Sequence, residues 1–248
     1  MIKLNFNKNY SKWFVNKVIW AIKNYSMIYP DDTIGVALSG GKDSSVLLYI
    51  LWYINRYSYL KFKLHAFHAK VADYEIKTLQ DYCYKLEVPL EIIPLPLKYE
   101  KMKESKCSIC SRFVKGAIIK SCKKFNIKKL AFGHSATDVT ETFFMNIFIH
   151  KKLGTFHPKI ELKREDITLV RPLIYLKEKK IEKIANYVGL NILKYKCPYS
   201  KENIRGFFKK NVQNLNKNFK VNNIEDFIIP SIENIDWTNI WRKNEKIY

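Results

Sequence analysis

Short apolar runs alternate with amphipathic segments along most of the chain. Thr33 to Leu38 is a continuous apolar run of strand length, and Ser44 to Ile54, which follows it, is apolar on every side. Such runs are typical of a buried strand and of a helix packed under a sheet. The same alternation predicts further strands over 63–69, 90–95, 129–132 and 168–170. It predicts further helices over 73–86, 112–123, 136–149 and 178–188.

Strands that alternate with helices at this spacing predict an α/β fold with a mainly parallel, Rossmann-like sheet and helices on both faces. An amphipathic helix is expected over 8–25, with Phe14, Val18, Ala21 and Ile22 on one face. The tail from Lys196 is rich in Lys, Asn and Phe and predicts a helical extension. We therefore expect an N-terminal helical segment (1–30), a main α/β domain (31–195) and a basic C-terminal extension (196–248).

The composition favours a folded protein whose partner is a polyanion. A hydrophobic fraction of 47% is ample for a core, and the formal charge is +21. A basic excess of this size favours nucleic acid through counterion release, although lysine-rich coding bias would produce the same excess. The longest apolar stretch spans ten residues, Ser45 to Ile54, whereas a membrane helix needs about 20. The first residues contain no secretory signal, so we expect a cytoplasmic protein without membrane contact.

A glycine loop joins the first predicted strand to the buried helix that follows. It runs Leu38-Ser-Gly-Gly-Lys-Asp-Ser-Ser45, and its two glycines let the backbone approach a ligand. A helix N-terminus with a nearby lysine and hydroxyl groups suits phosphate or pyrophosphate. The loop is not a Walker A sequence, because Val36 and Asp43 occupy the positions that need glycine and Ser/Thr. Asp43 would repel phosphate unless Mg²⁺ stood between them.

The five cysteines are Cys83, Cys107, Cys110, Cys122 and Cys197. An odd number in a cytoplasmic chain argues against a disulfide framework. Cys83 and Cys122 fall in helical patterns and are expected to be buried as small hydrophobic side chains. We place Cys107 and Cys110 on a polar loop that enters the helix over 112–123. Alone, this C-x₂-C pair could be a zinc half-site, a redox pair or two buried thiols.

The motif Ser-Gly-Gly-Lys-Asp-Ser after a first strand resembles the PP-loop of the N-type ATP pyrophosphatases. These enzymes have an adenine nucleotide alpha hydrolase-like fold, split ATP between its α and β phosphates, and adenylate a substrate oxygen. Over residues 30–210 the chain also resembles the TtcA/TtuA group of tRNA 2-thiolation enzymes, and within it the TtcA branch, which thiolates cytidine 32. The segments that carry this resemblance are Cys107-Ser-Ile-Cys-Ser-Arg112, Gly133-His134, Glu141-Thr142, Arg171-Pro-Leu173 and Cys197.

The resemblance implies an ATP-dependent sulfurtransferase that acts on tRNA with Mg²⁺ and a [4Fe–4S] cluster. The cluster ligands would be Cys107, Cys110 and Cys197, and the cluster would carry the sulfur to an adenylated C2. A cysteine desulfurase or sulfide would supply the sulfur, and a homodimer is possible. Three alternatives stay open: 2-thiouridine synthesis, a persulfide on Cys110 or Cys197 without a cluster, and a non-catalytic RNA-binding iron–sulfur protein.

The expected site residues fall into three groups. The catalytic residues are Asp43, Cys110, Asp138 and Cys197, with Asp43 also holding Mg²⁺. The nucleotide contacts are Ala37, Ser39, Gly40, Gly41, Lys42, Asp43, Ser44, Ser45, His68, Gly133, His134 and Asp138. His68 would act through its backbone or be only an edge histidine, and His134 could instead be a capping or core residue. The expected RNA contacts are Arg112, Lys115, Arg171, Lys201, Arg205, Lys209 and Lys210, because basic and aromatic residues mixed in this way suit RNA.

The chain departs from the pattern of these enzymes at two positions. The family usually has two consecutive carboxylates after the fourth strand, and here the first of them is Thr137, followed by Asp138. The family also usually has a basic residue four positions after the second cysteine of the pair. That position is Val114 here, between Arg112 and Lys115.

Overall fold

The computed structural model of the 248-residue chain describes residues 8–96, 106–190, 193, 204–218 and 223–236. The strands are β1 (Thr33–Ala37), β2 (Lys63–Lys70), β3 (Leu90–Pro94), β4 (Lys129–Ala131), β5 (Lys159–Leu162) and β6 (Ile167–Val170). The helices are α1 (Lys8–Asn24), α2 (Lys42–Tyr57), α3 (Lys77–Lys85), α4 (Lys106–Lys124), α5 (Ala136–Phe148), α6 (Glu178–Val188), α7 (Ile204–Asn218) and α8 (Glu225–Glu233).

The strands form one sheet in the order β3-β2-β1-β4-β6-β5, in which only β5 runs antiparallel to its neighbour. The chain leaves β1 toward β2 and β3 on one side, and later enters the other side through β4. The sheet therefore has a topological switch point between β1 and β4, which is where ligands bind in open α/β sheets. The glycine loop follows β1, and Gly133 lies two residues after β4, so both reach this point.

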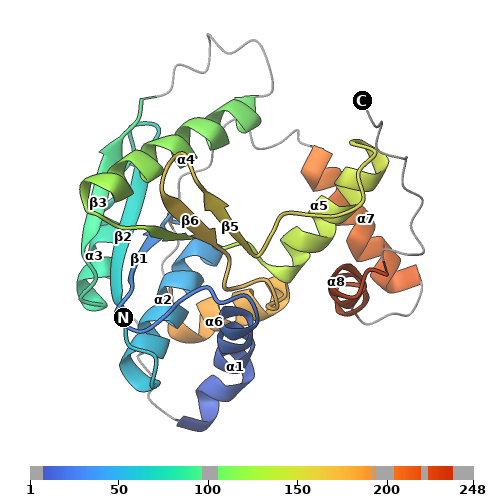
Figure 1. The fold of residues 1–248 in the computed structure, drawn as a ribbon, viewed down its shortest axis with the longest axis horizontal. Helices are drawn as coiled ribbons and strands as arrows, with labels where there is room; N and C mark the ends of the chain where they lie inside the picture. The colour runs from blue at the N-terminus through green and yellow to red at the C-terminus, as the bar shows by residue number, and fades with distance from the viewer. Residues whose placement is uncertain (1–7, 97–105, 191–192, 194–203, 219–222, 237–248) are drawn as a thin grey trace, which may run out of the picture.

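Helices cover both faces of the sheet, as the sequence predicts (Figure 1). The larger hydrophobic core joins α1, α2, α3 and α6 to one face, and a smaller core packs α4 against the other. Phe14, Val18, Ala21 and Ile22 of α1 are all buried in the larger core, which confirms the predicted apolar face. The helix predicted over 178–188 is confirmed, and it ends at Gly189 in the left-handed conformation.

Two local predictions are wrong, and one strand has no counterpart among the predictions. Cys107 and Cys110 lie within the first two turns of α4, which begins at Lys106, and not on a loop that precedes the helix. The helix predicted over 73–86 begins only at Lys77, and residues 73–76 precede it as irregular backbone. Strand β5 was not predicted, because it is a four-residue edge strand paired only with β6 and its own pattern is too short to identify.

The C-terminal extension is helical where the structure describes it. Helices α7 and α8 both pack against α5, so the three lie together beside the sheet (Figure 1). Within the described residues no helix is long and apolar enough to cross a membrane.

Candidate functional site

The loop after β1 folds back on itself through its serine side chains. The hydroxyl oxygens of Ser39 and Ser44 lie 2.9 Å apart, and the Ser44 hydroxyl donates to the carbonyl of Gly41 at 3.1 Å. Gly40 has a φ of +84°, and a Cβ there would lie 2.8 Å from the Cβ of Leu193. Gly41 is the N-cap of α2 and makes no side-chain capping bond. The N-terminus of α2 therefore keeps backbone N–H groups available for an anion.

Gly133 lets the end of β4 approach the start of α2 more closely than any other residue could. A Cβ at this position would lie 2.9 Å from the backbone carbonyl carbon and oxygen of Asp43. This contact is between two backbone segments, so no side-chain movement could relieve it. The residues after β4, from His134 to Asp138, are consequently held against the glycine loop.

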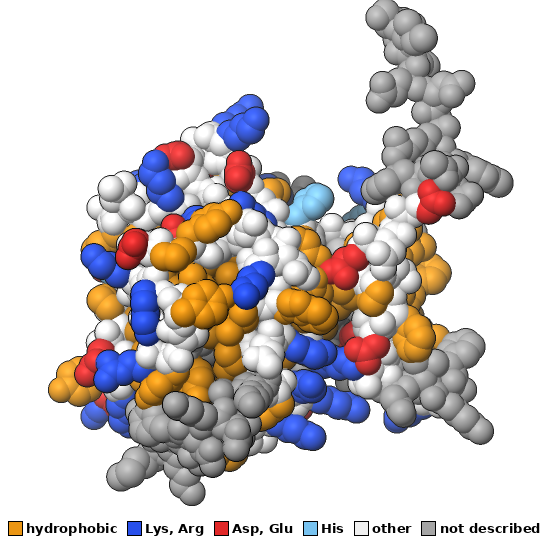
Figure 2. Space-filling view, turned by 60° about the horizontal axis from the view of Figure 1, so that its bottom comes forward, with side chains coloured by type: hydrophobic (Ala, Val, Ile, Leu, Met, Phe, Trp, Pro, Cys, Tyr) orange, Lys and Arg blue, Asp and Glu red, His pale blue; other side chains and the backbone are white. Residues whose placement is uncertain are grey.

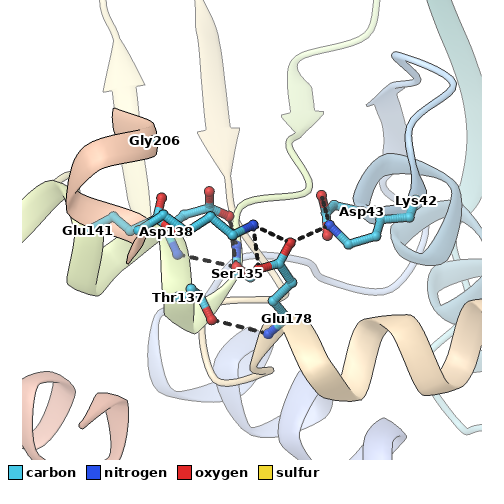
Figure 3. A pocket seen from close by; sticks show the side chains of 9 residues that line it. Lys42, Asp43, Ser135, Thr137, Asp138, Glu141, Glu178 and Gly206 are labelled. Carbon is cyan, nitrogen blue, oxygen red and sulfur yellow. Dashed lines mark hydrogen bonds and ion pairs between the residues drawn. The ribbon is translucent and has the colours of Figure 1, made fainter. Parts of the chain in front are cut away.

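A polar cavity of about 260 Å³ lies at the start of α2, between it and α5, α6 and α7 (Figure 3). Its lining residues are Lys42, Asp43, Ser135, Thr137, Asp138, Glu141, Glu178, Gly206 and Lys209. One carboxylate oxygen of Glu178 accepts hydrogen bonds from the ammonium groups of Lys42 and Lys209, each at 2.6 Å. Burial lowers the pKa of Lys42, but the Glu178 hydrogen bond and the charge of Asp43 outweigh it and raise the pKa overall. Lys42 is therefore cationic at the cavity wall.

Asp43 and Asp138 place two negative charges close together in this cavity. Burial raises the pKa of Asp43, and the charge of Asp138 raises it further, against the opposing effect of Lys42. The Oδ1 atom of Asp43 is buried without a hydrogen-bond partner in the structure. Oδ2 of Asp138 accepts from the backbone N–H and the hydroxyl of Ser135, in a capping box that starts α5. This arrangement suits a Mg²⁺ ion held by one or two carboxylates together with phosphate oxygens.

A second, more apolar cavity of about 410 Å³ adjoins the first and shares Asp43 and Asp138 with it. It lies at the ends of β1, β2 and β4 and reaches α4. Its lining residues are Ala37, Leu38, Ser39, Asp43, Ser44, His68, Ala69, Val71, Tyr74, Cys110, Val114, Ile118, Phe132, Gly133, His134 and Asp138. The glycine loop, the residues after β4 and one thiol of the C-x₂-C pair therefore meet around one cavity.

His68 is a buried residue of an internal strand, so the alternative of an edge histidine is wrong. Strand β2 lies between β1 and β3, and the His68 side chain is 1% exposed. Its Nδ1 lies 2.8 Å from the carbonyl oxygen of Leu38, and its Nε2 lies 3.0 Å from the hydroxyl of Tyr74. Burial lowers the pKa of His68. This neutral imidazole fixes the loop after β1 against β2 and lines the second cavity.

His134 and Arg171 form a second polar pair at the cavity. The Nε of Arg171 donates to Nδ1 of His134 at 3.2 Å, and the guanidinium lies over the ring of Phe156. Burial lowers the pKa of Arg171 to about 10. The guanidinium thus orients His134 from the end of β6, while the predicted RNA contact of Arg171 stays a prediction.

The described cysteines divide as the sequence predicts. Cys83 and Cys122 are buried, and burial raises the pKa of each thiol to about 12. Cys107 is exposed and Cys110 is half-buried, one helical turn apart on α4. Cys197 lies outside the described residues. Within the described ranges no three Cys, His, Asp or Glu side chains are grouped to hold a metal ion.

Residues three or four apart on a helix share a face, and Val114 accordingly lines the second cavity with Cys110. Arg112 and Lys115 are exposed instead. No basic side chain of this turn therefore replaces the one expected at position 114.

The predicted basic residues have different surroundings. Lys209 contacts Glu178 in the polar cavity, whereas Lys210, the next residue, is exposed. The side chains of Lys201 and Arg205 lie outside the described part of the chain. On the face in Figure 2, Lys and Arg side chains are scattered among exposed hydrophobic ones.

Not every residue of the glycine loop reaches a cavity. Ser45 is 1% exposed, its carbonyl oxygen accepts from the hydroxyl of Tyr82, and it lines neither of the two cavities. The predicted contact of Ser45 with nucleotide stays untested, but its position is that of a core residue. Gly40 is buried, and its carbonyl oxygen accepts from the backbone N–H of Leu193 at 2.9 Å.

Sequence reasoning missed two carboxylates: Glu178, which lines the polar cavity, and Glu225, which contacts the cavity residue Thr137. Glu178 begins α6. Its sequence signal is an acidic residue at the start of the helix that follows Arg171-Pro172, and this could have identified it. Glu225 of α8 is 7% exposed, and its Oε1 accepts from the hydroxyl of Thr137 at 3.1 Å. The same hydroxyl oxygen accepts a hydrogen bond from the backbone N–H of Glu178 at 3.2 Å. The position of the missing family carboxylate is thus occupied by a hydroxyl with a buried carboxylate beside it, and no sequence pattern indicated this contact.

A glycine loop and an uncapped helix N-terminus at the switch point of a parallel sheet define a nucleotide-binding class of α/β protein. The chain matches the family model of the PP-loop domain over residues 5–216. It belongs to this family.

Curated relatives and one solved structure are similar to the chain over most of its length. A tRNA-cytidine(32) 2-sulfurtransferase of Ralstonia pickettii (strain 12J) is 34% identical over 192 residues, which are 75% of this chain and 61% of the relative. A protein of the same name from Dichelobacter nodosus (strain VCS1703A) is 36% identical over 180 residues, 70% of this chain and 67% of the relative. This chain therefore spans about three fifths of the length of the first of these relatives.

The structure of the U34-tRNA thiolase NcsA from Methanococcus maripaludis, with its [4Fe–4S] cluster, has a TM-score of 0.72 to this chain. The match covers 91% of this chain and 79% of that one, at 20% identity. At this identity the likeness shows the fold.

Proposed function

We propose that the protein is an ATP-dependent tRNA sulfurtransferase that replaces the C2 oxygen of a tRNA base, preferably cytidine 32, with sulfur. The observation that carries the proposal is the pair of adjoining cavities that share Asp43 and Asp138. One is polar and contains two lysines, and the other is more apolar and contains Cys110. The names of the curated relatives support tRNA as the substrate and cytidine 32 as the target.

In this proposal the triphosphate of ATP lies along the start of α2. Its β and γ phosphates enter the polar cavity, where they displace Glu178 from Lys42 and Lys209. The adenosine occupies the second cavity, between the ends of β1 and β2. The α phosphate then lies at the boundary of the two cavities, beside Asp43 and Asp138. A Mg²⁺ ion held by Asp43 would neutralise charge between this carboxylate and the phosphates.

The reaction has two displacement steps. The C2 oxygen of the base attacks the α phosphorus, a new O–P bond forms, and the bond from that phosphorus to pyrophosphate breaks. Lys42, Lys209 and the N-terminus of α2 stabilise the negative charge on the departing pyrophosphate. A sulfide then attacks C2, a C–S bond forms, and the C–O bond breaks with release of AMP. Adenylation is needed because a carbonyl oxygen is otherwise a poor leaving group.

The thiols fit a role next to the reacting base. Cys107 and Cys110 lie one helical turn apart, and Cys110 lines the cavity that also contains Ser39 and His134. With Cys197, which lies outside the described residues, they would hold a [4Fe–4S] cluster that supplies sulfide at an iron without a cysteine ligand. The [4Fe–4S] cluster of the NcsA structure supports this choice over a persulfide on a bare thiol.

The proposal extends to the organisation of the chain. Residues 31–195 form the catalytic domain, 1–30 the helical segment that covers its core, and 196–248 a basic extension that closes the polar cavity through Lys209. The sulfur source is a cysteine desulfurase or free sulfide, and the protein works in the cytoplasm.

RNA-dependent release of AMP and pyrophosphate by the anaerobically reconstituted protein tests the proposal. A matched pair of variants tests the assignment of α7 to the polar cavity. Lys209→Ala should lower AMP release at least tenfold, because a charge-assisted contact in a dry site is worth about 1.5–3 kcal/mol. Lys85→Ala, which changes an exposed lysine of α3, should change it less than twofold.

Mass spectrometry of nucleosides from the treated tRNA should detect 2-thiocytidine. If a cluster-loaded sample forms no AMP with total tRNA, the proposed enzymatic activity is excluded. The alternative of a non-catalytic RNA-binding protein is then favoured. Formation of 2-thiouridine alone would show that the substrate base is uridine and not cytidine.

A further inference from the structure

A cleft lined by phenylalanine rings lies between α5 and α7, outside the two cavities described above. We call it the aromatic cleft, and its volume is about 560 Å³. Its lining residues are Phe144, Phe148, Phe207, Phe208, Asn211, Val212, Asn214 and Leu215. The two helices lie side by side along it (Figure 1).

Two rings of the aromatic cleft are exposed yet pack against neighbouring rings. Phe148 is 71% exposed and Phe207 is 64% exposed, whereas Phe208 is only 7% exposed. The Phe148 ring lies nearly parallel to Phe144 and Phe208, at interplanar angles of 17° and 20°. Phe207 contacts Phe208 edge to face. Two exposed rings are thus anchored by a buried one, which reduces the entropy lost when a flat ligand stacks on them.

The charge around the aromatic cleft favours a polyanion. No residue from Ile204 to Asn218 is acidic, and α7 carries Lys209, Lys210 and Lys217. Helix α5 runs directly into His150, Lys151 and Lys152, which are all exposed. The acidic residues of α5, Asp138 and Glu141, face the polar cavity at its other end. A second copy of this chain would bring another net charge of +21 to the same basic surface, so RNA suits the cleft better than a partner subunit does.

The aromatic cleft also adjoins the polar cavity. On α7, Gly206 and Lys209 line the polar cavity, while Phe207 and Phe208 line the cleft. On α5, Glu141 lines the polar cavity and Phe144, three residues later, lines the cleft. Residues three apart on a helix are neighbours. An RNA strand seated on the rings would therefore lie about one helical turn from the phosphate-binding lysines.

We propose that the aromatic cleft binds unpaired bases of an RNA loop, which stack on Phe148 and Phe207 while Lys210, Lys151 and Lys152 contact the backbone. Single-stranded bases stack on aromatic side chains whatever their sequence, and nearby cations bind their phosphates. This inference rests on the proposed function and extends it, because it names the surface that holds the bases next to the reacting one.

Binding of a synthetic anticodon stem–loop, measured by fluorescence anisotropy without ATP, tests the inference. Phe148→Leu and Phe207→Leu keep apolar surface but remove the flat ring. Each should weaken binding about tenfold, the loss expected when one stacked base is released. Phe148→Trp should bind as tightly as the wild type or more tightly. Tyr84→Leu is the control, because Tyr84 is 86% exposed on α3, which lies at the other end of the molecule from α5 and α7 (Figure 1).

A second probe removes the loop, as a duplex of the same stem sequence. The wild type should bind this duplex more weakly than the stem–loop. The leucine variants should bind the duplex as tightly as the wild type does. Leucine variants that bind the stem–loop as tightly as the wild type would overturn the inference. It would also be overturned if sedimentation showed a wild-type dimer that Phe148→Ala dissociates and Phe148→Leu retains, since a second copy would then occupy the cleft.

These outcomes are separable from failure of the proposed function. If the variants lose RNA binding but the wild type forms no AMP with tRNA, the cleft is confirmed as an RNA surface and the sulfurtransferase is excluded. If AMP forms and the leucine variants bind RNA normally, the sulfurtransferase is supported and the cleft is excluded as an RNA surface. If the wild type binds neither the stem–loop nor the duplex at low salt, both the RNA-binding cleft and the sulfurtransferase are excluded.

Discussion

Asp43 is an ionisable residue whose charged form is disfavoured in the ligand-free protein. Burial and the charges of Asp138 and Glu178 raise the pKa of its carboxyl, while Lys42 only partly compensates. One of its oxygens is buried without a hydrogen-bond partner. A buried carboxylate with a raised pKa is expected where function needs a cation beside it, even though its charge lowers the stability of the ligand-free fold.

Asp43→Asn should therefore stabilise the nucleotide-free protein at neutral pH. A raised carboxyl pKa means that the folded state binds the proton more tightly than the unfolded state. The wild type should accordingly lose stability as pH rises from about 4 through the raised pKa, and the variant should lose less. Because the side chain is partly exposed and solvent screens it, the gain in Tm is small, on the order of 2 °C. Thermal unfolding at several pH values measures it.

Asp73→Asn is the matched control. Asp73 is exposed, and its hydrogen bond with Lys70 lowers its pKa, so the dependence on pH has the opposite sign and Tm should not rise. Addition of Mg²⁺ and ATP should stabilise the wild type more than Asp43→Asn, since ligands stabilise the state that binds them. A ligand-free Asp43→Asn that melts below the wild type would show that the carboxylate is structurally satisfied.

At the residue scale the sequence identified the residues with a local signature and missed those that depend on tertiary contact. Ser39, Lys42 and Asp43 lie around the cavities because the glycine-loop motif fixes their backbone. Asp138 lies there because it starts α5 in a capping box with Ser135. The different surroundings of Lys209 and Lys210 follow from which side of α7 faces α6, and helix periodicity alone does not give that orientation. Glu225 meets Thr137 across 88 positions of the chain, and no local pattern records such a contact.

At the element scale the site depends on how closely β4 approaches α2. Gly133→Ala would place a Cβ 2.9 Å from the backbone carbonyl of Asp43. Neither backbone segment can move without disturbing a central strand or the start of a buried helix. We expect the free energy of unfolding to fall by about 1–3 kcal/mol, the usual cost of overpacking, with RNA-dependent AMP formation lowered at least tenfold. Urea unfolding and the AMP assay measure the two effects.

Gly116→Ala is the control, because Gly116 is an exposed residue of α4 with nothing within 4 Å of an added Cβ. Alanine there should stabilise the protein by roughly 0.5–1 kcal/mol, since glycine is unfavourable inside a helix. Equal effects of the two substitutions would mean that β4 and α2 are not in tight contact.

The elements themselves were predictable to the extent that hydrophobic periodicity marks them. The parallel strands β1, β2, β4 and β6 and the helix α2 are largely buried, so their apolar runs are distinct. Helix α6 is marked instead by the regular spacing of its one buried face. The start of α4 was missed because Cys107, Ser108 and Ser111 are polar or small and show no apolar face. Strand β5 was missed for a related reason, since an edge strand of four residues depends on its pairing with β6 rather than on its own pattern.

At the scale of the whole molecule, the net charge of +21 has two competing explanations, RNA binding and lysine-rich coding bias. Salt separates them. If about six phosphates of the stem–loop are contacted, the plot of log affinity against log salt has a slope near −4. Affinity should then fall by about 300-fold between 50 and 200 mM salt.

Charge and stacking should also respond to salt differently, and this contrast makes the prediction specific. Lys210→Ala removes one phosphate contact and should make the slope less steep by about 0.7. Phe148→Leu removes stacking, which releases no counterions, so it should lower affinity at every salt concentration and leave the slope unchanged. The same titration in anisotropy measures both variants against the wild type. A wild-type slope near zero would mean that the basic excess does not serve RNA binding, and coding bias would then account for it. A slope that Phe148→Leu changes as much as Lys210→Ala does would mean that the ring acts by placing lysines rather than by holding a base.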